Sequence, residues 1–316
     1  MLTQPEAVDF LLKNPTLVVA RLEEEAGMPP GTLHETLRGA GPLTGAQLDA
    51  LESVLRAHGL DEFRNRRARV VAVTNHKGGV GKTTTTLNLG RALALLHYRV
   101  LVVDLDAQGN LSQCLGVLEP ARQLGDVLGT GDALPVVPVL ENYDLVPSAI
   151  DLARMESELG RSPVGSQYLK ASLRPLLGQY DFVFIDCPPA LNIFTSSALI
   201  AADSVLVVMQ PEISAYRGIN SLLEIIDDTR TYLNAGLHIG GVVLSQVDKR
   251  LVVHREVIRS IRQELAPYQV LETEIRTNTA LKESQLVQQD IFRYQPTSTG
   301  AADYQALAQE FLRRCV

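Results

Sequence analysis

The sequence has few cysteines and no long apolar run. Its three cysteines, Cys114, Cys187 and Cys315, are far apart, show no metal-ligand spacing and cannot all pair with one another. This usage favours a reduced, cytoplasmic setting. The best candidate for a membrane segment, residues 205–209, has only the length of a strand. Residues 1–6 lack the basic and apolar regions of a signal peptide, so we expect none.

Positive charge is also scarce. The 316 residues include 29 Lys and Arg against 36 Asp and Glu, which gives a net charge of −7. The chain as a whole therefore does not attract nucleic acid or anionic lipid, and any such contact requires a local basic patch. The length is sufficient for one large domain with an appendage.

A regular alternation of short apolar runs and helical stretches begins near Arg69. Several of the runs are continuously apolar, which is typical of parallel strands buried on both faces. We therefore predict a doubly wound α/β domain over residues 68–316, with a mostly parallel sheet and a ligand crevice at the carboxyl ends of its strands. Residues 1–67 carry helix formers and no strand signal, so they predict a small helical domain. The predicted strands are 70–74, 100–104, 182–186, 205–209 and 241–245.

A glycine-rich loop lies between the first apolar run and the following helical run. It reads Lys-Gly-Gly-Val-Gly-Lys-Thr-Thr over residues 77–84. Glycines let backbone N–H groups turn onto phosphate oxygens without a Cβ clash. Lys82 is placed for the β- and γ-phosphates of ATP, and the Thr83 hydroxyl for Mg²⁺. Lys77, at the mouth of the loop, is a second lysine that needs another role.

Carboxylates follow two of the other predicted strands. Asp104 ends the run 100–104 and Asp106 follows two residues later, and residues spaced in this way point to the same side if the chain stays extended. One could hold Mg²⁺ through water while the other orients or deprotonates the attacking water. The alternative is a pair of loop aspartates that cap the next helix. Asp186 ends the run 182–186, as a Walker B aspartate does near the metal.

These motifs resemble those of the ParA family of DNA-partition ATPases, in the ParA/MinD deviant Walker A superfamily. The loop matches Lys-Gly-Gly-x-x-Lys-Ser/Thr, and residues 185–189 match Ile-Asp-Cys-Pro-Pro in full. Ala107 stands where the family's Asp-x-Asp-Pro-Gln segment has proline. The resemblance covers about residues 69–314.

The family implies a weak, partner-stimulated ATPase that uses ATP and Mg²⁺ and forms a homodimer with ATP. Lys77 would reach the partner's nucleotide across the dimer. The implied catalytic residues are Lys77, Lys82 and Asp106, and the implied metal-site residues are Thr83, Asp104 and Asp186. The implied nucleotide-binding residues are Lys77, Gly78, Gly79, Val80, Gly81, Lys82, Thr83 and Thr84, with Pro211 and Gln246 near ribose and adenine.

The family further implies binding to non-specific DNA, a ParB-type partner and association with the nucleoid. The stretch 249–293 carries eight basic and six acidic residues. Arg250 occupies the family's Asp-x-Arg position, and Arg276 and Lys282 lie near a second basic position, where Ala280 replaces an arginine. One alternative is a MinD-like membrane ATPase, which needs a basic amphipathic C-terminal helix. Here Tyr304, Leu307 and Phe311 predict a packed helix instead.

Residues 22–39 resemble a helix-turn-helix unit. Gly27 provides the turn, and Met28, Leu33 and Leu37 are apolar where two crossed helices meet, although Glu23 stands where a small residue is usual. Because residues 1–60 carry four basic and eight acidic residues, DNA binding would need a local cationic face. The interpretation is an operator-binding autorepressor, or a repressor tuned by nucleotide. A dimerisation or scaffold role is the alternative. The residues expected at this face are Thr32, His34 and Arg38.

Overall fold

The computed structural model describes residues 1–315, with side chains for all of them except 213–218. The chain forms two compact units. One contains Met1–Arg67 with Leu96–Tyr98, and the other contains Ala68–Leu95 with the chain from Arg99 onward. Each unit has its own hydrophobic core.

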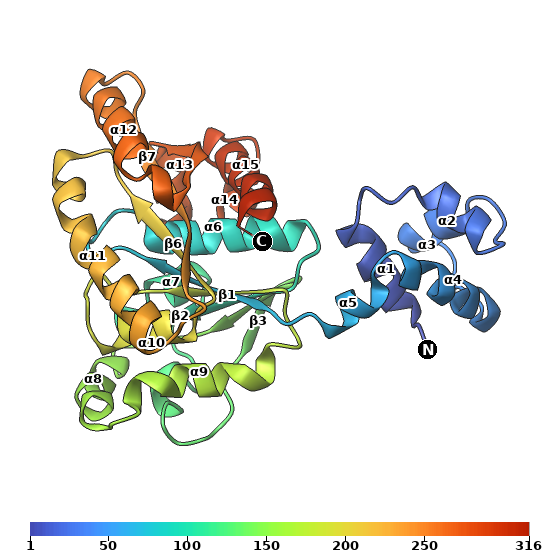
Figure 1. Cartoon of the computed structure of the whole chain (residues 1–316), viewed down its shortest axis with the longest axis horizontal. Coiled ribbons are helices and arrows are strands. Elements are labelled where there is room, and N and C mark those ends of the chain that lie inside the picture. Colours follow the sequence, from blue (N-terminus) through green and yellow to red (C-terminus); the bar gives the residue numbers. More distant parts are fainter. Residues whose placement is uncertain (316) are drawn as a thin grey trace. The chain divides into compact units, whose positions relative to one another are not determined.

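The N-terminal unit is helical (Figure 1). Thr3 and Thr44 begin α1 and α4 with capping boxes, in which each hydroxyl accepts from the third helical N–H. Leu22, Leu33 and Leu51 are almost fully buried in its core. The predicted helix-turn-helix pair corresponds to α2 and α3. The helices are α1 (Gln4–Lys13), α2 (Val19–Glu25), α3 (Thr32–Leu37), α4 (Gly45–Ala57) and α5 (Leu60–Asn65).

Glu23 has a structural role that its place in the helix-turn-helix pattern does not suggest. Its side chain is buried, and its carboxylate oxygens accept from Gly31 N at 2.9 Å and Leu33 N at 2.7 Å. Burial by itself would raise the pKa of Glu23. The N–H groups of Gly31, Leu33 and His34 outweigh burial, and the pKa lies below its usual value of 4.5. Glu23 therefore fixes the start of α3 onto α2.

Replacing Glu23 with alanine is expected to destabilise the N-terminal unit by about 1–3 kcal/mol, because two buried N–H groups lose their acceptor. Hydrogen exchange of the α3 amides in the full-length protein measures this loss. Since the folded pKa is lowered, the carboxylate stabilises the unit above pH 4.5, and this contribution disappears as the pH falls through the folded pKa. The difference in stability between the wild type and Glu23→Gln should therefore shrink in acid. Equal protection at pH 7 in the wild type and Glu23→Ala would contradict this role.

The second unit contains an eight-stranded sheet in the order β3-β4-β2-β5-β1-β6-β7-β8. Every neighbouring pair is parallel except β3 and β4, so the predicted doubly wound, mostly parallel fold is confirmed. The five predicted runs form β1, β2, β5, β6 and β7. The strands are β1 (Arg69–Thr74), β2 (Val100–Asp104), β3 (Val137–Leu140), β4 (Tyr143–Val146), β5 (Phe182–Asp186), β6 (Ser204–Met209), β7 (His238–Val247) and β8 (Val270–Arg276).

Helices cover both faces of this sheet (Figure 1). One face packs against α6 (Lys82–Leu95) and α15 (Thr299–Arg314), and the other against α10 (Ile193–Ala201) and α11 (Ile213–Tyr232). This double cover explains why β1, β5 and β6 are continuously apolar. The remaining helices of four or more residues are α7 (Asn110–Cys114), α8 (Leu152–Arg161), α9 (Tyr168–Leu173), α12 (Val252–Glu264), α13 (Thr279–Leu286) and α14 (Ile291–Tyr294).

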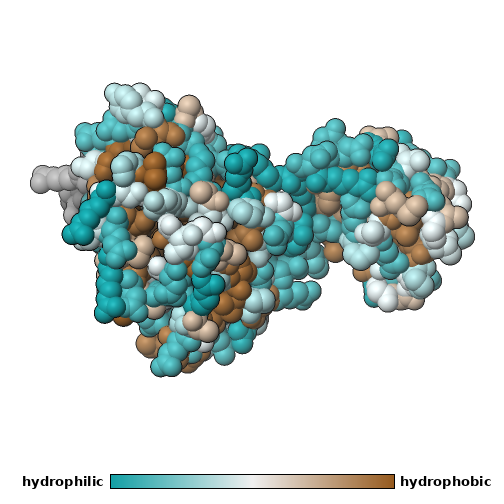
Figure 2. Space-filling view, turned by 90° about the horizontal axis from the view of Figure 1, so that it is seen from below, coloured by the Kyte–Doolittle hydropathy of each residue, from teal (hydrophilic) through white to brown (hydrophobic). Residues whose placement is uncertain are grey.

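The last helix packs inward, as its sequence predicts. Tyr304, Leu307 and Phe311 of α15 are each at most 1% exposed. Within the described part of the chain, no helix has the length and apolar character needed to cross a bilayer. On the face drawn in Figure 2, hydrophobic residues lie in separate patches between hydrophilic ones. Because Tyr304, Leu307 and Phe311 are buried, the apolar side of α15 belongs to the hydrophobic core of its own unit.

Candidate nucleotide-binding site

The glycine-rich loop connects β1 to α6. Gly79 and Gly81 have φ values of 75° and 94°, which residues with a Cβ rarely adopt. Buried Asn75 fixes the start of the loop, because its amide donates to Val208 O at 2.8 Å while its oxygen accepts from Lys77 N at 3.0 Å. The loop thus delivers its N–H groups and the N-terminus of α6 to one point, which is a favourable place for phosphate.

The end of β7 holds the same loop from the other side. Ser245 Oγ donates to Val80 O at 2.6 Å, and Gln246 Nε2 donates to Gly79 O at 2.7 Å. Gln246 takes a φ of 52°, so the chain turns sharply as it leaves the strand. The structure therefore places Gln246 beside the phosphate-binding loop, and its expected contact near ribose and adenine stays a prediction.

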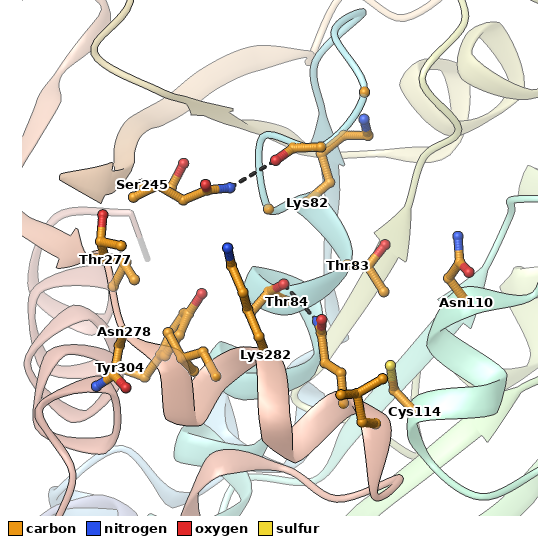
Figure 3. Close-up of a pocket in the computed structure, with 18 of the residues that line it drawn as sticks. Lys82, Thr83, Thr84, Asn110, Cys114, Ser245, Thr277, Asn278, Lys282 and Tyr304 are labelled. Carbon is orange, nitrogen blue, oxygen red and sulfur yellow. Dashed lines mark hydrogen bonds between the residues drawn. The ribbon is translucent and has the colours of Figure 1, made fainter.

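A cavity of about 760 Å³ opens above the loop, at the carboxyl ends of β1, β2, β7 and β8 (Figure 3). This is the size and the place expected for a small ligand in such a fold. Val80 and Pro211 are buried, and neither they nor Lys77 belong to the lining. The predicted residues that line the cavity are Gly78, Gly79, Gly81, Lys82, Thr83, Thr84, Asp106 and Gln246.

Lys82 lies at the base of this cavity. It is only 6% exposed, and its ammonium donates to Lys77 O at 3.1 Å across the loop. Burial lowers the pKa of Lys82, and the nearby Asp186 and Asp106 act in the opposite direction. An anionic phosphate would provide the counter-charge that this buried ammonium needs.

Thr83 is joined to the predicted Walker B carboxylate. Its hydroxyl donates to Asp186 at 2.7 Å, and the Thr86 hydroxyl donates to the same carboxylate at 3.2 Å. Burial, and next the charge of Asp104, raise the pKa of Asp186 to about 8. No group of three metal-ligating side chains occurs among the described residues. This donor set fits Mg²⁺, which commonly takes one or two protein oxygens and completes its shell with phosphates and water.

The structure separates the two predicted aspartates of the β2 segment. Asp104 is fully buried and does not line the cavity, and its oxygens accept from Ser112 N and Oγ and from Asp106 N. Burial raises its pKa to about 6. It therefore anchors the start of α7 and the Asp106 loop, which is the capping role. Asp106 lines the cavity, and its orienting or deprotonating role stays a prediction.

Comparison with known proteins gives the family. A family model described as an AAA domain matches residues 68–239. A chromosome partitioning protein ParA from Caulobacter vibrioides is 39% identical over 255 residues, covering 78% of this chain and 94% of the relative. The sporulation initiation inhibitor protein Soj from Bacillus subtilis is 37% identical over 247 residues, covering 77% of this chain and 97% of the relative. The chain belongs to the ParA/Soj family. It is a deviant Walker A ATPase.

The solved structure of a similar protein contains bound nucleotide and metal. The protein titled cobyrinic acid a,c-diamide synthase from Mycobacterium smegmatis, with bound ADP and magnesium, is 35% identical and has a TM-score of 0.68. The match covers 78% of this chain and 94% of that one. The cofactors of this ParA/Soj-family ATPase are accordingly ATP and Mg²⁺. The metal would neutralise charge on the phosphates, while Lys82 and the loop N–H groups hold them.

One wall of the site was not predicted. Ile275 and Arg276 end β8, Thr277 and Asn278 follow it, and all four line the cavity together with α13. Asn278 accepts from Ala280 N at 2.8 Å and so caps α13. The only sequence signal for β8 is the alternating pattern over 270–276, which is typical of a half-exposed edge strand.

Two of the residues expected on the DNA surface also lie at this wall. Arg276 forms hydrogen bonds of 3.0 Å with the carboxylate of buried Asp303, and Lys282 lines the cavity. Arg250 is 89% exposed and pairs with Asp248 at 2.7 Å, which lowers the pKa of that carboxyl to about 2. All three residues are exposed, with Arg250 the more open of the two that form ion pairs, so contact with DNA stays a prediction for each of them.

The predicted DNA face of the N-terminal unit has little positive charge. The Thr32 hydroxyl donates to Pro29 O at 2.7 Å, and His34 Nδ1 lies 3.8 Å from the Glu23 carboxylate. Arg38 is exposed, and within residues 1–67 as described it is the one Lys or Arg that neither an ion pair nor another interaction engages. A cationic face on this unit would therefore depend on Arg38.

Proposed function

We propose that this ATPase is a DNA-partition protein whose ATP-bound dimer binds non-specific DNA and releases it after hydrolysis. The observation that supports this most is the position of Lys77. Lys82, Thr83 and Asp106 already face the nucleotide cavity of one subunit, while Lys77 does not line it. Its ammonium instead pairs with Glu212 Oε2 at 2.6 Å on the rim of the site.

The ion pair between Lys77 and Glu212 can be broken at a small cost in free energy. The side chains of Lys77 and Glu212 are 30% and 46% exposed, and ion pairs at such positions contribute about 0–1 kcal/mol. A triphosphate in a second subunit would compete well for the same ammonium. Lys77 would then act in trans, as arginine fingers do in other phosphoryl-transfer enzymes. This arrangement makes the dimer sensitive to the γ-phosphate.

Exposed cations in the first turn of α12 and just before it supply the proposed DNA contact. Arg250 and Arg255 are both exposed, and Arg255 has no ion pair among the described residues. A two-fold dimer presents each of them twice, which strengthens binding to a repeating phosphate backbone. The names of the Caulobacter and Myxococcus relatives, chromosome partitioning protein ParA, support the same function. A ParB-type partner would stimulate hydrolysis, and the protein would associate with the nucleoid.

DNA binding measured with ADP, ATP and a non-hydrolysable analogue tests this proposal. Binding should require ATP or the analogue and should fall steeply with salt. The double variant Arg250→Ala/Arg255→Ala should weaken it at least about tenfold and reduce the salt slope by roughly 1 per lost phosphate contact. Lys170→Ala, an exposed lysine on α9, is the matched control. Binding that is equal in ADP and ATP would contradict an ATP-gated dimer.

The alternatives have distinct tests. Operator binding by the N-terminal unit stays a prediction, and deletion of residues 1–66 should remove specific but not non-specific DNA binding if it is correct. A MinD-like membrane role lacks support, because α15 buries Tyr304, Leu307 and Phe311 against its own domain. The synthase activity belongs to the name of the Mycobacterium smegmatis protein, and the relatives named ParA align over an equal share of this chain.

A further inference from the structure

Lys282 lines the nucleotide cavity together with two other cations, Lys82 and Arg276. It lies on α13 and belongs to the same lining as Lys82 and Thr83. Figure 3 shows its side chain leaving α13 and extending into the cavity, toward the space bordered by Ser245 and Thr84. Lys282 is exposed, and its side chain borders this concave site.

The surroundings of Lys282 differ from those of the neighbouring cations. Within the described part of the chain, Lys282 has neither an ion pair nor a side-chain hydrogen bond. Lys249 pairs with Glu274, Arg250 with Asp248, and Arg276 with Asp303. Lys282 is thus a cation without a counter-charge, directed into the cavity that receives an anionic ligand.

The helix that carries Lys282 is fixed to the phosphate-binding loop. Gln285 Nε2 donates to Thr84 Oγ1 at 2.7 Å, which joins α13 to α6. Asn278 caps α13 and donates to Thr299 Oγ1 at 2.6 Å, and Leu281 and Ser284 are buried beneath the helix. The base of the Lys282 side chain therefore has a set position relative to the loop, as a binding residue requires.

The geometry points to Lys282 as a nucleotide-binding residue that contacts the α-phosphate and the ribose end of the ligand in its own subunit. Lys82 and Thr83 hold the distal phosphates at the loop, and the end of β8 forms the wall farther along the cavity. Lys282 projects between these two parts. It therefore stabilises ADP and ATP to the same extent, in contrast to Lys77, whose proposed role depends on the dimer. This inference rests on ATP binding and not on the partition function.

Titration calorimetry with MgADP, and with Mg²⁺ and a non-hydrolysable ATP analogue, tests this role. Lys282→Ala is expected to weaken both ligands about tenfold, as for the loss of one charge-assisted hydrogen bond. Lys282→Arg should restore most of the affinity, and Lys282→Glu should weaken it further. Lys249→Ala is the matched control, because Lys249 lies outside the cavity and pairs with Glu274.

DNA binding provides the second measurement. With saturating ATP analogue, Lys282→Ala should bind non-specific DNA as the wild type does. Unchanged affinity of Lys282→Ala for MgADP would overturn the inference, and a simultaneous loss of DNA binding would assign Lys282 to the DNA surface instead. A loss confined to the ATP analogue, with ADP unaffected, would also overturn it, because it would place the ammonium at the γ-phosphate. The melting temperature of each nucleotide-free variant shows whether it is folded.

Discussion

Replacing Lys82 with alanine is expected to reduce the affinity for both MgADP and MgATP by about 30- to 4,000-fold. Lys82 is a buried cation at the base of the cavity, and a phosphate there would be a buried partner. Removing one member of such a pair costs about 2–5 kcal/mol. The variant also loses the 3.1 Å hydrogen bond to Lys77 O, which closes the loop on itself.

Titration calorimetry measures this loss directly. Lys170→Ala, an exposed lysine on α9, is the control for a general effect of charge. Because a buried lysine is costly without a counter-charge, nucleotide-free Lys82→Ala should be at least as stable as the wild type. Unchanged nucleotide affinity would contradict the placement of the phosphates at residues 77–84.

The Lys77→Ala and Lys77→Gln variants are expected to keep ADP affinity but lose ATP-induced dimers, and hydrolysis should fall by about 10³-fold or more. The magnitude follows from residues that act in trans in related phosphoryl transfer, which contribute about 10³–10⁵ in rate. Lys77 does not line the cavity of its own subunit, so ADP binding by the monomer does not depend on it. Sedimentation with a non-hydrolysable analogue measures dimer formation, and normal dimers of Lys77→Gln would contradict its role.

Glu212→Gln is the matched variant for this test. It removes the charge that holds Lys77 at the rim within one subunit, at a distance of 2.6 Å. If Lys77 leaves Glu212 to meet the partner's nucleotide, this variant should dimerise at an equal or lower ATP concentration than the wild type. If the pair is itself required for the dimer, Glu212→Gln should fail as Lys77→Gln does. The two variants therefore separate the trans lysine from a structural salt bridge.

Much of the site could be predicted because its chemistry is local in the chain. The loop 77–84 follows one strand directly, and Asp186 ends another, so their meeting follows from a parallel sheet. The central strands could be predicted for a similar reason, since strands covered on both faces are continuously apolar. The edge strand β8 exposes part of its surface, and its weaker pattern concealed the wall that carries Thr277 and Asn278.

Other assignments depended on residues far away in the sequence. Whether Asp104 or Asp106 faces the nucleotide depends on Ser112, whose N–H and hydroxyl engage Asp104. Arg276 lies at the cavity because a carboxylate 27 residues later in the chain, that of Asp303, accepts its hydrogen bonds. Local spacing could not reveal these pairings, because they arise only when the helices close over the sheet.

The most direct test of the ATP-gated dimer is the ATPase activity of a mixture of two inactive variants. One is Lys77→Ala and the other is Asp106→Ala, combined in equal amounts. If Lys77 acts in trans, a mixed dimer has one complete site, formed by Asp106 of the first subunit and Lys77 of the second. Each mixed dimer has one complete site of two, so the mixture should recover activity that neither variant has alone, up to about one half of the wild-type activity if all subunits pair with the other variant. No recovery, in a mixture where cross-linking shows that mixed dimers form, would contradict the account.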